Sequence, residues 1–240
     1  MPRTLSAWFF DWDNTLLDLD STFRDTFRAV LAPLCEAWGV DPDHLRRVMD
    51  DVWPTVWARG LSGALTGSAL YPEWFREALP RAGFPTTALD PDEVAEYFDH
   101  QFEDSLRLHP DALPALLTIR SQTPRPRLVI LTNGLTKRQM RRIEAVGVLP
   151  YVDAVLTSEM VGAPKPGRAF FDTALGVAEV SREAALMIGD DPATDIAGAN
   201  RAGIASVWVN RHGRSWPETL IHPSLTVTDL AHLLQTLEIS

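Results

Sequence analysis

The sequence predicts an α/β protein in two parts: a Rossmann-like parallel sheet with helices on both faces, and a helical domain inserted after the first strand. The apolar run at residues 7–10 is typical of a buried strand. Residues 20–106 then carry apolar side chains at helical spacing. Further along, helices and strands alternate, as they do when parallel strands are joined by crossover helices. We therefore predict a core of residues 1–17 and 108–240, with a four-helix cap domain at residues 18–107.

The helices of the inserted domain are predicted from apolar side chains three and four positions apart. Gly39, Gly60 and Gly83 follow three of these stripes and are expected to end them. Pro33 and Pro54 lie inside two stripes, so we expect a kink or break at each. The four helices are expected around residues 23–38, 45–57, 74–79 and 94–106.

The strands of the core are predicted from short apolar runs that separate the helical stretches. Such runs, rather than an alternating pattern, are typical of parallel strands because helices cover both faces of the sheet. The five strands are expected at residues 7–10, 128–131, 154–156, 185–188 and 206–209.

Composition limits the classes of function. The 240 residues are 45% hydrophobic, which is ordinary for a globular protein, and the formal net charge is −10. Residues 18–107 hold 17 acids against eight bases, so a nucleic-acid polymer is not an expected partner. No apolar run is long enough for a membrane span, and the single cysteine, Cys35, fits a reducing compartment. We expect a cytoplasmic protein; its oligomeric state is not predicted.

Polar residues follow four of the predicted strands. Because open parallel sheets bind ligands beyond the carboxyl ends of their strands, these residues predict one convergent site. They are Asp11, Asp13 and Thr15 after the first strand, Thr132 and Asn133 after the second, Lys165 in the loop after the third, and Asp190, Asp191 and Asp195 after the fourth.

The residue types indicate phosphoryl chemistry with a metal. Clustered carboxylates repel one another, and a hard divalent cation such as Mg²⁺ offsets this with all-oxygen ligands. A carboxylate can attack phosphorus to form an aspartyl phosphate, while a second acid protonates the leaving alkoxide. The chain has 20 arginines and two lysines, and Lys165 stands where a compact cation suits a crowded phosphate site, whereas Lys137 is expected to face solvent.

Four stretches resemble, in order, the motifs of the haloacid dehalogenase superfamily, in its phosphatase branch with a helical cap. They are residues 10–16, 131–134, 165–166 and 189–195. The resemblance implies that Asp11 is the nucleophile and that Asp13 is the general acid and base. It implies that the phosphoryl group is bound by Thr132, Asn133 and Lys165. It implies that Mg²⁺ is held by the Asp11 carboxylate, the Asp13 backbone carbonyl and the Asp190 carboxylate. Supporting roles fall to Thr15, Asp191 and Asp195, and either Asp191 or Asp195 acts on the metal through water or from the second coordination shell.

The substrate expected from the resemblance is a small phosphorylated metabolite. Residues 158–162 and 208–217 are similar to members that dephosphorylate nucleoside 5′-monophosphates, especially those of pyrimidines. Phosphatases acting on sugar phosphates, N-acylneuraminate phosphates or phosphoglycolate are the alternatives.

Other reactions remain open at this stage. A 2-haloacid dehalogenase on the same fold would not need Asp13, because no alkoxide is protonated. A phosphomutase would share the chemistry and differ in the cap. A receiver-type phospho-acceptor module also combines Asp, Mg²⁺, Thr and Lys-Pro. It carries its acceptor on a middle strand and lacks an inserted domain, so it is disfavoured. A catalytically inactive interaction protein is disfavoured because every required group is present.

Overall fold

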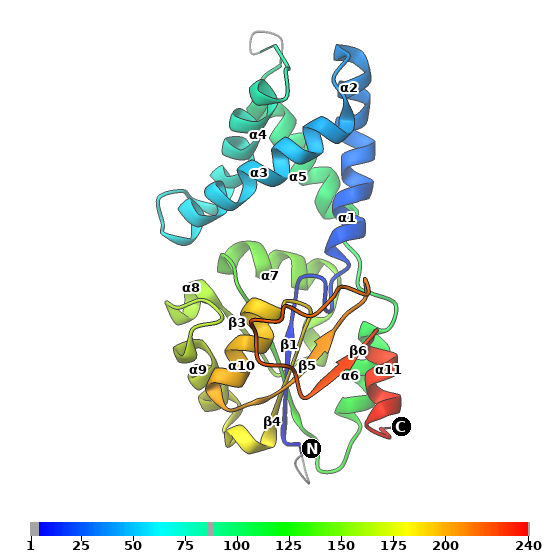
Figure 1. Ribbon diagram of the computed structural model, residues 1–240, viewed down its shortest axis with the longest axis vertical. Coiled ribbons are helices and arrows are strands. Elements are labelled where there is room, and N and C mark those ends of the chain that lie inside the picture. The colour runs from blue at the N-terminus through cyan, green and yellow to red at the C-terminus, as the bar shows by residue number, and fades with distance from the viewer. Residues whose placement is uncertain (1–4, 86–88, 240) are drawn as a thin grey trace. The chain divides into compact units, whose positions relative to one another are not determined.

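A computed structural model of the chain describes residues 5–85 and 89–239. The chain divides into two units, each with its own packing (Figure 1). The core unit comprises Met1–Asp18 and Arg107–Ser240, and the inserted unit comprises Leu19–Leu106. The insertion therefore follows the first strand of the core unit.

The apolar runs of the core unit form a six-stranded parallel sheet with the order β3-β2-β1-β4-β5-β6. This confirms the predicted α/β fold. Strand β1 lies between β2 and β4, at the centre of the sheet. The edge strand β6 is not predicted from the sequence, because three residues are too few to show a pattern. The strands are β1 (Ala7–Asp11), β2 (Arg127–Thr132), β3 (Ala154–Thr157), β4 (Ala185–Gly189), β5 (Ala205–Val209) and β6 (Leu225–Val227).

Helices cover both faces of this sheet. Helices α9 and α10 lie on one side of the strands, and α6 and α11 lie together on the other (Figure 1). The helices of the core unit are α6 (Ala112–Arg120), α7 (Thr136–Ala145), α8 (Ser158–Val161), α9 (Arg168–Ala178), α10 (Ala197–Ala202) and α11 (Leu230–Thr236). Its shorter turns are η3 (Leu149–Tyr151), η4 (Arg182–Ala184) and the π-helical η5 (Pro192–Ile196).

Strand β1 is anchored on both faces by apolar packing. Phe9 belongs to a buried cluster with Leu131 of β2 and Phe171 of α9. Trp8 and Phe10 point to the opposite face, because side chains alternate along a strand, and their rings stack 6.4 Å apart. Full burial of such side chains contributes roughly 1.5–3 kcal/mol each. The carboxyl end of β1 is therefore fixed by the core of the protein.

The inserted unit is helical, as predicted. Where an interruption was expected at Pro33, a π-helical turn, η1, connects α1 to α2, because proline lacks an N–H and its ring crowds the preceding turn. A kink or break was expected at Pro54, and helix α3 runs through this residue without a break. Among the helices in the described ranges, none is both long and apolar enough to cross a bilayer. The elements of this unit are α1 (Leu19–Thr26), η1 (Phe27–Leu31), α2 (Ala32–Trp38), α3 (Pro42–Leu61), η2 (Gly67–Ala69), α4 (Leu70–Arg81) and α5 (Pro91–Asp104).

Aromatic side chains form the centre of the inserted unit. The ring of Trp74 lies 4.7 Å from that of Trp53 and 5.8 Å from that of Phe23, measured between centroids. Its Nε1 donates a 2.8 Å hydrogen bond to the carbonyl of Met49, so the buried indole leaves no donor unpaired. These rings join helices α1, α3 and α4 into one packed unit.

Candidate active site

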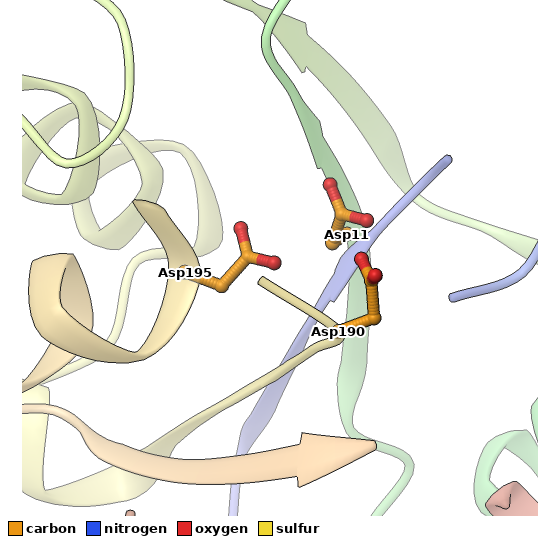
Figure 2. A group of neighbouring side chains, drawn as sticks. All are labelled: Asp11, Asp190 and Asp195. Atoms are coloured by element: carbon orange, nitrogen blue, oxygen red, sulfur yellow. The ribbon is translucent and has the colours of Figure 1, made fainter. Parts of the chain in front are cut away.

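Three carboxylates converge at the carboxyl ends of β1 and β4 (Figure 2). Asp11 is the last residue of β1, Asp190 directly follows β4, and Asp195 lies on η5. Each offers an oxygen within 4.8 Å of those of the other two. Carboxylate oxygens are the donors that hard divalent cations prefer. The arrangement is therefore a candidate cation site assembled from separate stretches of the chain.

Lys165 binds two of these carboxylates. Its Nζ donates to Oδ1 of Asp11 at 2.6 Å, to Oδ1 of Asp195 at 2.7 Å and to the carbonyl of Leu131 at 2.8 Å. The side chain is 2% exposed, and these three bonds use all the protons of the ammonium group. Asn133 fixes the backbone of Lys165, because its Oδ1 accepts from the lysine N–H at 2.8 Å and its Nδ2 donates to the lysine carbonyl at 2.9 Å. Both ends of the Asn133 amide thus hold the lysine in place.

The site carries more negative charge than one lysine can neutralise. Burial raises the pKa of Asp11 well above its ordinary value, and the Asp195 carboxylate raises it further, against the lowering effect of Lys165. Burial also raises the pKa of Asp195, and it raises that of Asp190 to about 7, although Arg214 opposes the shift. Burial lowers the pKa of Lys165, but the Asp11 and Asp195 carboxylates outweigh it and keep this pKa above the usual value. The uncompensated charge and the all-oxygen donor set both fit a divalent cation.

The loop after β1 holds the Asp11 carboxylate from its other side. Within the turn of residues 12–17, Asn14 adopts a left-handed conformation with φ of 61°, which asparagine tolerates better than most residues. Thr15 Oγ1 donates to Asp11 Oδ2 at 3.0 Å. Because Lys165 binds Oδ1, both oxygens of Asp11 have a donor and the carboxylate is fixed in orientation.

Asp13 and Thr132 meet at a side chain that sequence reasoning missed, Gln139 of α7. The Nε2 of Gln139 donates to Asp13 Oδ2 at 2.9 Å and to Thr132 Oγ1 at 2.8 Å. One turn further along α7, Arg142 Nη1 lies 3.8 Å from Asp13 Oδ1. Both Gln139 and Arg142 are buried. The sequence shows only two polar residues three positions apart on an amphipathic helix, a pattern that most surface helices share.

The fourth stretch separates the roles of its acids. Asp191 Oδ1 accepts from the N–H groups of Ala193 at 2.7 Å and Thr194 at 3.2 Å, so this carboxylate caps η5. The Asp195 carboxylate instead turns into the cluster, where its Oδ2 accepts from the Asp191 N–H at 3.1 Å. A Cβ on Gly189 would overlap the Asp195 carboxylate, so only glycine allows this approach. Of the two acids left open by the sequence, Asp195 lies beside Asp11 and Asp190.

Two arginines after β5 donate hydrogen bonds to the loops that follow β1 and β4. Arg211 Nη2 donates to both carboxylate oxygens of Asp111, each at 3.0 Å, and to the carbonyl of Thr15 at 3.1 Å. Arg214 Nη2 donates to the carbonyl of Asp190 at 2.6 Å. The ends of β1 and β4 are therefore both tied to the segment that follows β5, a connection that the sequence did not reveal.

A central strand that ends in a buried aspartate, bonded to a lysine and flanked by further acids, is typical of α/β enzymes whose site lies beyond the carboxyl ends of a parallel sheet. The chain belongs to the haloacid dehalogenase-like hydrolases, because the profile of that family matches residues 5–203. This confirms the resemblance noted in the sequence and makes the protein an enzyme of the hydrolase class.

Two characterised relatives align with nearly the whole chain. The pyrimidine 5′-nucleotidase YjjG of Escherichia coli strain K12 is 32% identical over 230 residues, which cover 95% of this chain and 96% of the relative. The phosphoserine phosphatase of Thermus thermophilus is also 32% identical, over 90% of this chain and 95% of the relative. Both are similar to this chain, and they act on different substrates.

Solved structures share the fold. A magnesium-bound structure of YfnB from Bacillus subtilis has a TM-score of 0.76 at 22% identity, covering 99% of this chain and 100% of that one. A 2-haloacid dehalogenase from Pseudomonas syringae pv. tomato has a TM-score of 0.64 at 26% identity, covering 98% and 99%. Both structures share the fold of this chain, and a shared fold does not identify the reaction, so the residues at the strand ends must decide.

Proposed function

We propose that the protein is a Mg²⁺-dependent phosphatase that hydrolyses a small phosphomonoester through an aspartyl phosphate on Asp11. The observation that carries this proposal is the Asp11 carboxylate, held by Lys165 and Thr15 and lying beside Asp190 and Asp195. A carboxylate fixed by donors at both oxygens is oriented for attack, and effective positioning of this kind lowers a reaction barrier substantially.

The residues that would hold Mg²⁺ are the carboxylates of Asp11 and Asp190 and the backbone carbonyl of Asp13, with Asp195 completing the acidic group. A bound Mg²⁺ supplies positive charge beside the phosphoryl oxygens, where negative charge accumulates during transfer. Thr132 and Lys165 would supply further donors to the same oxygens. Because both bonds of the Asn133 amide go to the Lys165 backbone, Asn133 supports the phosphoryl site by placing this lysine.

The reaction proceeds in two displacements at phosphorus. An Asp11 oxygen attacks phosphorus, the bond from phosphorus to the substrate oxygen breaks, and Asp13 gives its proton to the leaving alkoxide. Asp13 then takes a proton from water, the water oxygen attacks phosphorus, and the bond to Asp11 breaks. Inorganic phosphate leaves, and both aspartates return to their starting states.

Asp13 distinguishes this proposal from dehalogenation. Halide departure needs no proton, whereas an alkoxide does, and Asp13 is held at Oδ2 by a buried amide donor. Membership of the hydrolase family removes the receiver-module alternative. A phosphomutase would use the same residues, so product analysis must separate it from a phosphatase.

For the substrate, we propose a nucleoside 5′-monophosphate first. The nucleotidase relative supports this choice, while the phosphoserine phosphatase relative shows that similar chains act on other phosphomonoesters. We further propose that the core unit is the catalytic domain and that the inserted unit is a cap that selects the leaving group.

The test is phosphate release from a panel of phosphomonoesters with and without Mg²⁺. The panel includes pyrimidine and purine monophosphates, phosphoserine, sugar phosphates, N-acylneuraminate 9-phosphate and phosphoglycolate, with 2-chloropropionate as a probe for halide release. We expect turnover only with Mg²⁺, none in Asp11→Asn, and wild-type turnover in Asp172→Asn, the same change at an exposed position of α9. Full activity of Asp11→Asn, or halide release in place of phosphate release, would contradict the proposal.

A further inference from the structure

Gln139 connects two residues that the proposed reaction uses for different purposes. Its side-chain amide has two N–H bonds, of which one goes to Asp13 and the other to Thr132. Asp13 lies 126 positions away in the chain, and Thr132 lies seven positions before Gln139. A single buried amide thus fixes the spacing between the proposed acid–base group and a proposed phosphoryl-binding hydroxyl.

The direction of these hydrogen bonds determines what Thr132 can do. A threonine hydroxyl has one proton, and here its oxygen accepts from Gln139 Nε2. The proton of Thr132 is therefore left to donate to an incoming phosphoryl oxygen. If the amide were turned round, Gln139 Oε1 would face Asp13 Oδ2 and the donor to Asp13 would be lost.

The same contact makes the two oxygens of Asp13 unequal. Oδ2 is bonded to Gln139, whereas Oδ1 is buried, has no hydrogen-bond partner and lies 3.8 Å from Arg142 Nη1. A buried oxygen without a hydrogen-bond partner is unusual and calls for an explanation. The Gln139 donor fixes which oxygen of Asp13 faces the Arg142 guanidinium.

Space around Gln139 leaves it little freedom to move. A Cβ on Gly134 would lie 2.9 Å from both Cγ and Nε2 of Gln139, which is closer than side chains normally approach. Gly134 lies in the loop that joins β2 to α7, and its lack of a side chain leaves the space in which Gln139 packs against the loop.

We propose that Gln139 is a positioning residue that holds the Asp13 carboxyl group by Oδ2 and turns Thr132 toward the phosphoryl group, so that Asp13 is oriented for the proton-transfer step. This inference rests on the proposed phosphatase reaction. It assigns a residue of α7, outside the four motif stretches, to the proton-transfer step.

The test compares Gln139→Met with Gln139→Glu, two variants of similar size that lack the amide donor. An alkyl phosphomonoester needs Asp13 for both displacements, whereas p-nitrophenyl phosphate has a leaving group that departs without a proton. We expect kcat on the alkyl substrate to fall roughly 10–100-fold in Gln139→Met. With p-nitrophenyl phosphate we expect a burst of one equivalent of nitrophenolate per enzyme, followed by slow turnover, because with this substrate Asp13 is needed only for hydrolysis of the aspartyl phosphate.

A double-mutant cycle with Asp13→Asn provides a second readout. If Gln139 acts through Asp13, then Gln139→Met costs far less kcat in the Asp13→Asn enzyme than in the wild type. Lys137→Met places methionine at an exposed position of α7. It should leave kcat and the kinetics with p-nitrophenyl phosphate unchanged, in the wild type and in the Asp13→Asn enzyme.

An equal loss of rate on the alkyl and aryl substrates without a burst, or an undiminished cost in the Asp13→Asn enzyme, overturns the inference. If Gln139→Met does not fold, Gln139→Glu gives the same comparison in a side chain of the original shape. Absence of turnover and burst in the wild-type enzyme with Mg²⁺ would instead mean that the proposed function is wrong.

Discussion

The Nζ of Lys165 lies 2.6 Å from Oδ1 of Asp11, although 154 positions separate the two residues in the chain. The same ammonium also donates to Asp195 and to the carbonyl of Leu131, so none of its protons is left over. A phosphoryl oxygen bound by Lys165 must therefore share or replace one of these bonds. The lysine thus stabilises the fold of the resting site as well as the proposed reaction.

Lys165→Met should destabilise the metal-free protein and stop the reaction. The change removes the buried cation that faces two buried carboxylates, which costs about 3 kcal/mol in the free energy of unfolding. Loss of a donor to the phosphoryl oxygens should lower kcat/KM by at least about 10²-fold. Urea unfolding in EDTA and steady-state kinetics with Mg²⁺ measure the two effects.

Lys137→Met is the matched control for that variant. Lys137 is exposed on α7, so its replacement should change stability by no more than about 0.5 kcal/mol and leave turnover intact. Similar losses of stability in the two variants would mean that the buried ion pairs of Lys165 do not contribute to the free energy of unfolding.

Removal of the metal should make stability fall as the pH rises. The pKa of Asp190 is raised to about 7 in the folded protein, mainly by burial, from an ordinary value of 3.8. Between these values the folded state keeps a proton that the unfolded state has lost, so unfolding becomes easier with increasing pH. One such proton gives a slope of up to about 1.4 kcal/mol per pH unit. Urea unfolding in EDTA from pH 5 to pH 8 measures this slope.

Two comparisons isolate the contribution of Asp190 from that of other titrating groups. Asp190→Asn should flatten the slope, and Mg²⁺ should stabilise the wild type more at pH 8 than at pH 5, because the cation competes with protons for the same oxygens. If the dependence of the free energy of unfolding on pH were identical in wild type and Asp190→Asn, burial would not raise the pKa of Asp190 in the metal-free protein.

The sequence predicted those features that depend on neighbouring residues or on the direction of the strands. Residues 7–10 are apolar throughout because helices cover both faces of β1, and parallel strands place Asp11, Thr132 and Asp190 at one edge of the sheet. These features need no knowledge of how side chains pack.

Other features depend on packing that the sequence does not encode locally. The contact of Gln139 with Asp13 depends on how α7 is rotated over the strand ends, and a glutamine on an amphipathic helix gives no sign of it. Asp191 and Asp195 look equivalent in sequence, but the cap of η5 uses one and the cluster uses the other. Pro54 did not end its helix, because tertiary packing of α3 outweighs the lost hydrogen bond.

Gly189→Ala should weaken the candidate cation site. A methyl group at this position would overlap the Asp195 carboxylate, which must then move away from Asp11 and Asp190. Displacing a group that supports metal ligands costs roughly 10–100-fold in metal affinity. The Mg²⁺ concentration for half-maximal turnover and the Mg²⁺-induced rise in melting temperature both report this change.

Gly176→Ala is the control, because nothing lies within 4 Å of the added methyl group in the last turn of α9. It should leave the Mg²⁺ dependence unchanged and stabilise the protein by roughly 0.5–1 kcal/mol, since alanine favours a helix over glycine. If both alanine variants bound Mg²⁺ as the wild type does, the close approach at Gly189 would have no role in metal binding.

The last prediction separates the two acids of the fourth stretch. Asp191→Ala removes the cap of η5 and should cost about 1 kcal/mol of stability, with a Mg²⁺ dependence close to that of the wild type. Asp195→Asn removes a charge from the carboxylate cluster and should raise the Mg²⁺ concentration for half-maximal turnover by roughly 10–100-fold. Titration of turnover with Mg²⁺, beside urea unfolding of each variant, gives both quantities. If Asp191→Ala raised the Mg²⁺ concentration for half-maximal turnover as far as Asp195→Asn does, the cap and the cluster would act as one unit. The assignment of Asp195, and not Asp191, to the cation site would then be wrong.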